Sequence, residues 1–69
     1  MTDEEQFMIE CITTELVACV MDDFHVEMQT ALDKVYASET YAKLINLHTG
    51  LYYQSPLYVY DFLKEELNK

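Results

Sequence analysis

The stretch TGLYYQSPLYVY, residues 49–60, contains the only glycine and the only proline of the 69-residue chain, together with four of its six tyrosines. Gly50 predicts the end of one helix, because glycine enters the left-handed conformation without steric cost. Ser55 followed by Pro56 predicts the start of another, since serine caps a helix and proline at the first helical position loses no hydrogen bond. The stretch therefore predicts a joint between two helices, with residues 51–54 extended or irregular.

The chain before this joint has the composition of a helical protein. Residues 1–49 contain no glycine or proline, and Glu, Leu, Met, Ala and Lys fill much of their length, which favours helix throughout. Polar residues that can cap helices, namely Thr2, Asp22 with Asp23, and Ser38, are expected to divide it. We predict a single all-α domain over residues 1–69, a compact bundle of three to four short helices at residues 3–21, 23–37, 39–47 and 56–67.

The break between the first two helices is open at this level. The residue types also permit one uninterrupted helix over residues 3–37, which would be about 50 Å long and could not form a compact monomer. Residues 16–21 are all apolar and go most of the way round a helical wheel, and a helix that is apolar on all sides must be buried on all sides. A chain of this size buries only about 60% of its unfolded surface. We therefore expect a homodimer or a higher assembly to supply part of the burial.

The charge of the chain restricts its partners. Thirteen acidic residues oppose four lysines and no arginine, so the formal net charge is −9. Affinity for nucleic acids needs Lys and Arg to neutralise phosphates, and we expect no nucleic-acid partner. The same charge attracts basic proteins and speeds their encounter. No apolar run approaches the roughly 18 residues of a membrane span, and no basic stretch precedes an early apolar run, so neither a membrane segment nor a secretion signal is predicted.

The two cysteines indicate a reducing compartment. Cys11 and Cys19 lie eight residues apart in one predicted helix, about 12 Å along its axis, which is too far for a disulfide. Unpaired thiols among apolar neighbours suit the cytoplasm. The same surroundings raise a thiol pKa, so a cysteine nucleophile with His25 or His48 as its base is disfavoured.

A group of potential metal ligands lies near the predicted break between helices. Asp22, Asp23, His25 and Glu27 are close in sequence, and His48 follows further on. None of the recognised ligand spacings is present. We predict no catalytic residue, no cofactor and no metal site, and keep a small metal- or ligand-binding protein as a third alternative.

The tyrosines are candidates for an interaction surface, because tyrosine offers a large contact area and a hydroxyl that tolerates water. On the last helix Tyr60 falls with the core stripe and Tyr58 on the opposite side. In an extended segment Tyr52 and Tyr53 would point to opposite faces, so at least one of them faces outward, unless all pack over the edges of the core. The predicted interaction surface consists of Leu16, Val17, Val20, Met21, Tyr52, Tyr53 and Tyr58.

The chain also carries a pattern of residues spread over most of its length. These are Phe7, Cys11, Ile12, Ala31, Leu32, Tyr36, residues 48–50, Tyr58, Val59 and the acidic segment 61–66. The pattern resembles small uncharacterised bacterial all-helical proteins associated with toxin/antitoxin-like gene neighbourhoods. The resemblance implies a helical interaction protein and supplies no catalytic residue.

Two functions follow as hypotheses. The first is a non-enzymatic protein–protein interaction module of a bacterial cytoplasm that associates with itself. The second is an acidic inhibitor or antitoxin-like protein that masks a basic surface on its partner.

Overall fold

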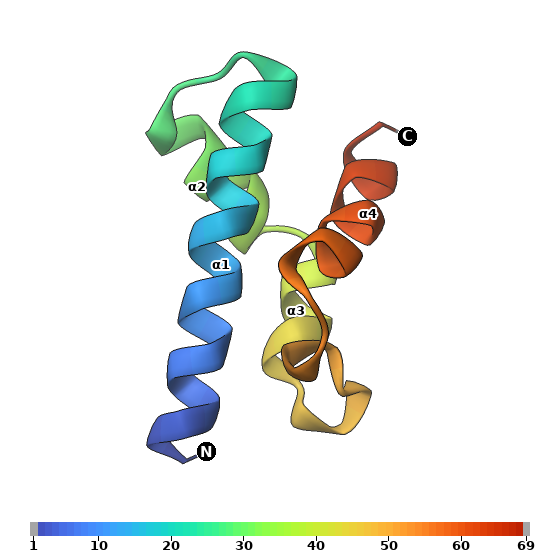
Figure 1. Ribbon diagram of the computed structural model, residues 1–69. Coiled ribbons are helices and arrows are strands. Elements are labelled where there is room, and N and C mark those ends of the chain that lie inside the picture. The colour runs from blue at the N-terminus through green and yellow to red at the C-terminus, as the bar shows by residue number, and fades with distance from the viewer. Residues whose placement is uncertain (1, 69) are drawn as a thin grey trace.

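The computed structural model describes residues 2–68 and contains four α-helices and two short 3₁₀ turns, with no strand in this part of the chain (Figure 1). The predicted all-α bundle is confirmed. The elements in chain order are α1 (Asp3–Phe24), α2 (Met28–Tyr36), α3 (Glu39–Ile45), η1 (Leu47–Thr49), η2 (Leu51–Tyr53) and α4 (Pro56–Leu67).

The first helix starts as the sequence predicts and ends later. Thr2 and Glu5 form a reciprocal cap: the Glu5 N–H donates to Thr2 Oγ1 at 3.1 Å, and the Thr2 N–H donates to Glu5 Oε1 at 2.8 Å. The predicted cap at Asp22 and Asp23 is wrong, because both residues lie in the last turn of α1. The chain turns instead at His25, whose left-handed φ of 54° ends the helix. This turn rules out one continuous helix over residues 3–37.

The joint after α3 contains more structure than expected. Helix α3 ends at Ile45, and Gly50, with a φ of 73°, ends the 3₁₀ turn η1 rather than α3. A second 3₁₀ turn, η2, replaces the extended segment expected at residues 51–54. The predicted start of the last helix is confirmed: Pro56 is its first residue, and Ser55 Oγ accepts the Tyr58 N–H at 3.2 Å.

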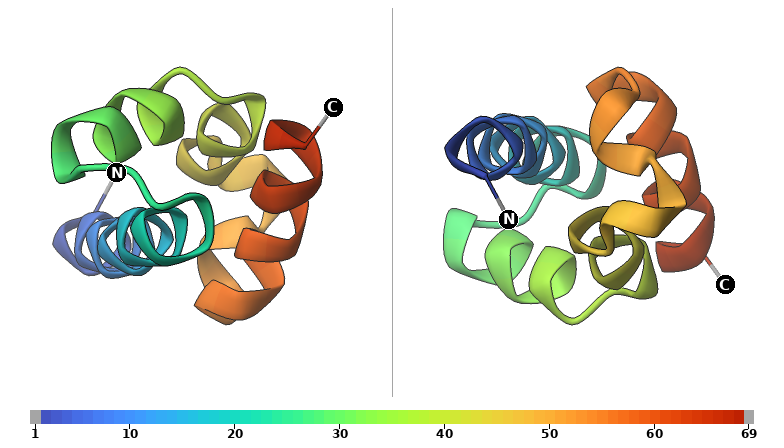
Figure 2. Two further views of the ribbon diagram at one scale, coloured as in Figure 1. Left: turned by 90° about the horizontal axis from the view of Figure 1, so that it is seen from above. Right: turned by 90° about the horizontal axis from the view of Figure 1, so that it is seen from below.

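The core lies between all four helices. Seen along α1, helix α2 lies on one side of it, α4 lies across the core, and α3 lies between α2 and α4 (Figure 2). The Cα radius of gyration is 11.3 Å, close to the roughly 11 Å expected for a compact chain of this length. The largest fully buried side chains are Leu16, Val20, Val35, Leu44, Val59 and Leu63.

A carboxylate of α4 caps the start of α3. Glu66 Oε2 accepts the Glu39 N–H at 2.8 Å, and Glu66 Oε1 accepts the Thr40 N–H at 3.0 Å and the Thr40 hydroxyl at 2.8 Å. Partial burial alone would raise the pKa of Glu66, but these hydrogen bonds to its charged form outweigh burial and lower the pKa. The contact ties together two helices that are separated along the chain by the joint.

Candidate functional site

The structure divides the predicted interaction surface into buried and exposed members. Tyr53 is 70% exposed and Tyr58 is 48% exposed, and Met21 is half-buried. The other four members are buried within the chain itself, so they present almost no surface to a partner. These are Leu16, Val17, Val20 and Tyr52.

The apolar half of α1 is covered largely by its own chain, and burial of the remainder by a second chain stays a prediction. The helix is not buried on all sides, because Ala18 is exposed. On the other sides α2 and α4 of the same chain pack against it, and they contribute the buried residues Ala31, Val35, Val59 and Leu63 to the core. Helical periodicity shows how much of a helix is apolar, whereas the arrangement of the neighbouring helices decides what covers it.

One apolar groove runs between α1, η2 and the start of α4, and we call it the Phe7 groove. Phe7 is 65% exposed and lies in this groove with the strongly exposed Tyr53. No charged side chain lines it. Its lining residues are Phe7, Met8, Cys11, Ile12, Tyr52, Tyr53, Gln54 and Pro56.

A second apolar groove runs between α1 and α2, and we call it the Met28 groove. Met28 is 59% exposed and Tyr36 is 53% exposed. The groove continues past Tyr36 into a polar hollow that includes Glu10 and Tyr41, and the rings of Tyr36 and Tyr41 meet edge to face at 5.0 Å. The residues lining the groove are Thr13, Thr14, Val17, Ala18, Met21, Met28, Leu32 and Tyr36.

The tyrosines around the joint have distinct environments. The Tyr52 hydroxyl donates to Glu5 Oε2 at 3.3 Å, which links η2 to the first turn of α1. The ring of Tyr53 lies against the ring of Tyr52, with centroids 4.2 Å apart. Tyr58 meets Phe62 edge to face at 5.3 Å on the outer side of α4. Tyr52 thus supports the floor of the Phe7 groove, whereas Tyr53 forms its exposed rim.

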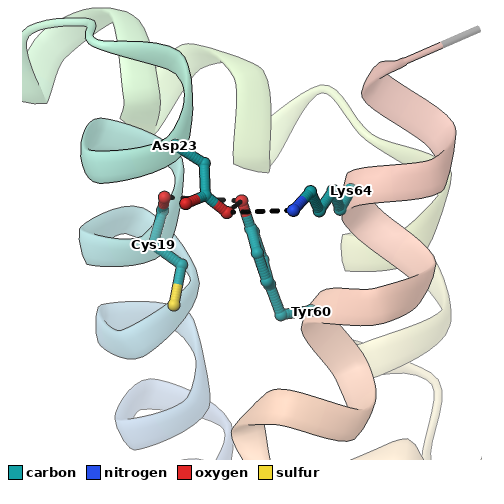
Figure 3. A network of polar contacts seen from close by, with 4 residues as sticks. All are labelled: Cys19, Asp23, Tyr60 and Lys64. Atoms are coloured by element: carbon teal, nitrogen blue, oxygen red, sulfur yellow. Dashed lines mark hydrogen bonds and ion pairs between the residues drawn. The ribbon is translucent and has the colours of Figure 1, made fainter.

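Tyr60 forms the main polar contact between α4 and α1 (Figure 3). Its hydroxyl donates to Asp23 Oδ2 at 2.7 Å and lies 3.4 Å from the Cys19 carbonyl oxygen, while Lys64 Nζ lies 3.6 Å from Asp23 Oδ2. The Tyr60 hydrogen bond is the largest cause that lowers the pKa of Asp23, and Lys64 adds to it. Burial, together with the neighbouring Asp23 carboxylate, raises the pKa of Tyr60. The arrangement fixes Asp23 as a structural anion.

The candidate metal ligands and thiols lie at exposed or half-buried positions. Within residues 2–68, no group of three or more His, Cys, Asp or Glu side chains is placed to hold a metal ion. His25 and His48 are both exposed. Burial, reinforced by Asp23 and other carboxylates, raises the pKa of the Cys19 thiol, which disfavours the nucleophilic thiolate.

Comparisons with known proteins add no relative. No protein-family model matches the chain, and no match is found among the curated proteins or the solved structures. No helix within residues 2–68 combines the length and the apolar character needed to cross a bilayer.

Phe7 and Met28 are two of the exposed apolar residues that the sequence did not indicate as surface candidates. Met28 lies in the first turn of α2 and opens to solvent. Phe7 could have been found from its helical phase, since it lies about 180° around α1 from the buried residues Ile9 and Leu16 on average. An aromatic side chain on the polar side of a helix is the signal.

Proposed function

We propose that this protein is a non-enzymatic protein–protein interaction module. The observation that supports the proposal is the Phe7 groove, where two large aromatic side chains, Phe7 and Tyr53, are each more than half exposed beside an uncharged lining. Aromatic side chains gathered on a surface are typical of contact sites, because burying them against a partner removes a large apolar area from water. A reducing, cytoplasmic location fits the two free cysteines.

A second copy of the chain is the first partner proposed for this groove. Two chains that each carry a net charge of −9 repel one another, so they can associate only where few carboxylates meet. The Phe7 groove meets this condition, because none of its lining residues is charged. A two-fold axis through the groove would place Phe7 of each copy near Tyr53 of the other, as in an isologous dimer.

Sedimentation velocity at concentrations from about 5 to about 500 µM tests the proposed dimer. The wild-type protein is expected to shift from monomer to dimer over this range. Phe7→Glu should stay monomeric, because the new carboxylate would be buried without a partner. Met28→Glu adds the same charge at a comparably exposed site in the other groove and should dimerise as the wild type does. A strictly monomeric wild-type protein at the highest concentration would contradict the dimer.

An acidic inhibitor or antitoxin-like protein is the second candidate function. The net charge of −9 and the resemblance to the bacterial helical proteins support it, as does the pairing of Lys64 with Asp23, which occupies one of the few cations. Binding to the product of the neighbouring gene should weaken as salt rises, since screening reduces the attraction between opposite charges. Binding that is insensitive to salt would argue against this function.

A further inference from the structure

The walls of the Met28 groove suit an apolar helix. Met28 and Leu32 of α2 face Val17 and Ala18 of α1 across it. Helix α2 has nine residues, so its wall is about 12 Å long, or two to three helical turns. The small side chain of Ala18 leaves room for a partner, and the flexible thioether of Met28 adapts to different apolar shapes.

The two threonine hydroxyls along the groove are already satisfied within α1. The Thr13 hydroxyl donates to the Ile9 carbonyl oxygen at 2.7 Å, and the Thr14 hydroxyl donates to the Glu10 carbonyl oxygen at 3.0 Å. Both hydroxyl hydrogens are therefore used, and the two threonines need no hydrogen-bond acceptor from a ligand. A partner with an apolar face can cover this wall without leaving a donor unpaired.

One acidic residue adjoins the groove in space, and two more adjoin it along the chain. Glu10 lines the hollow beyond Tyr36, and the exposed residues Asp22 and Glu27 are the chain neighbours of the groove residues Met21 and Met28. Among residues 2–68, no lysine lines the groove or that hollow. Of the described side chains that line the groove or the hollow, the one charged group is therefore the carboxylate of Glu10.

We propose that the Met28 groove binds an amphipathic helix of a partner protein, with Lys or Arg flanking the apolar face of that helix. The proposal rests on the interaction-module function and names the class of partner for this second surface. Apolar side chains at helical spacing would fill the groove, and a cation beside that apolar face would approach Glu10. A second copy of this chain supplies few cations for Glu10, because it carries thirteen acidic residues and four lysines.

A designed peptide provides the probe. It is a fluorescein-labelled amphipathic helix of about 15 residues with leucines on one face and lysines on the other, and its matched partner carries glutamate in place of every lysine. Fluorescence anisotropy should show binding of the lysine peptide that weakens several-fold between about 50 and about 500 mM salt. The glutamate peptide should bind at least about tenfold more weakly.

Two variants separate the groove from general attraction to an acidic protein. Met28→Lys and Leu57→Lys each add one positive charge at an exposed residue in the first turn of a helix, and Leu57 is 70% exposed. Met28→Lys should weaken binding of the lysine peptide at least about tenfold, while Leu57→Lys should stay within about twofold of the wild type. Helical circular dichroism and urea unfolding confirm that both variants fold.

Three outcomes would overturn the proposal. Equal binding of the two peptides would show that charge does not select the partner. An equal effect of the two lysine variants would show that the peptide is attracted to the acidic protein as a whole and not to the groove. If the wild type and Phe7→Glu form dimers but Met28→Lys does not, a second copy of the chain covers the Met28 groove. Dimerisation through the Phe7 groove is measured without the peptide, so a failed peptide experiment leaves the proposed self-association standing, and a monomeric protein leaves the peptide result interpretable.

Discussion

Tyr58 and Tyr60 lie two residues apart on α4, yet Tyr58 is 48% exposed and Tyr60 is 6% exposed. The adjacent residues Tyr52 and Tyr53 repeat the contrast within η2. The inner pair, Tyr52 and Tyr60, each donate a hydrogen bond to a carboxylate of α1. The outer pair contact rings of their own segments: Tyr53 lies at a tilt against Tyr52, and Tyr58 meets Phe62 edge to face. One residue type thus holds the C-terminal half of the chain against α1 and also supplies the surface that remains for partners.

The largest difference between the pairs is expected on truncation to alanine. Tyr60→Ala should lower the free energy of unfolding by about 3 to 5 kcal/mol, because it removes a buried ring and leaves a cavity between α4 and α1. Tyr58→Ala should cost about 1 kcal/mol or less, the contribution of its edge contact with Phe62. Urea unfolding followed by circular dichroism measures both. Equal losses for the two variants would show that the buried and exposed positions do not differ in their contribution to stability.

A smaller change tests the inner hydroxyls alone. Tyr60→Phe keeps the ring and removes the hydrogen bond to Asp23, and it should lower the free energy of unfolding by about 1 kcal/mol. Tyr52→Phe should cost less, because its bond to Glu5 is longer, at 3.3 Å against 2.7 Å, and Glu5 keeps its contact with Thr2. Tyr58→Phe is the matched control and should match the wild type in the same urea titration. A larger cost for Tyr52→Phe than for Tyr60→Phe would contradict this ranking.

The sequence predicts which tyrosine of α4 is buried and which is exposed, but it does not do so for the two tyrosines of η2. Ser55 and Pro56 fix where α4 begins, and the helical period then places Tyr60 inside and Tyr58 outside. For η2 the sequence indicates only that Tyr52 or Tyr53 faces outward. The choice depends on Glu5, which lies 47 residues away along the chain, and no local pattern carries information over that separation.

The same limit explains the errors on the N-terminal side. His25 takes a left-handed conformation that glycine usually occupies, so the end of α1 has no conventional signal, and the polar pair Asp22 and Asp23 was the more obvious break. The burial of Leu16 and Val20 depends on how α2 and α4 pack, which the sequence of α1 does not contain. Of the predicted interaction surface, tertiary packing buries Leu16, Val17, Val20 and Tyr52, whereas Tyr53 and Tyr58 are exposed. Helical register was enough to predict the exposure of Tyr58 but not the choice between Tyr52 and Tyr53.

The smallest effect expected is the pH dependence of the stability that the Tyr60 hydrogen bond to Asp23 contributes. The Tyr60 hydrogen bond lowers the pKa of Asp23 from its ordinary value of 3.8, so the unfolded chain binds a proton at this site at a higher pH than the folded protein does. The stabilisation is therefore complete above about pH 5 and is lost as the pH falls through the folded pKa of Asp23.

The difference in unfolding free energy between the wild type and Tyr60→Phe should stay constant from about pH 7 to about pH 5 and shrink below about pH 4. Tyr58→Phe should show no such trend, and comparing variants at each pH removes the general effect of neutralising the other carboxylates. A difference that grows on acidification would mean that Tyr60 stabilises the protonated form of Asp23, contrary to the short hydrogen bond that its hydroxyl donates.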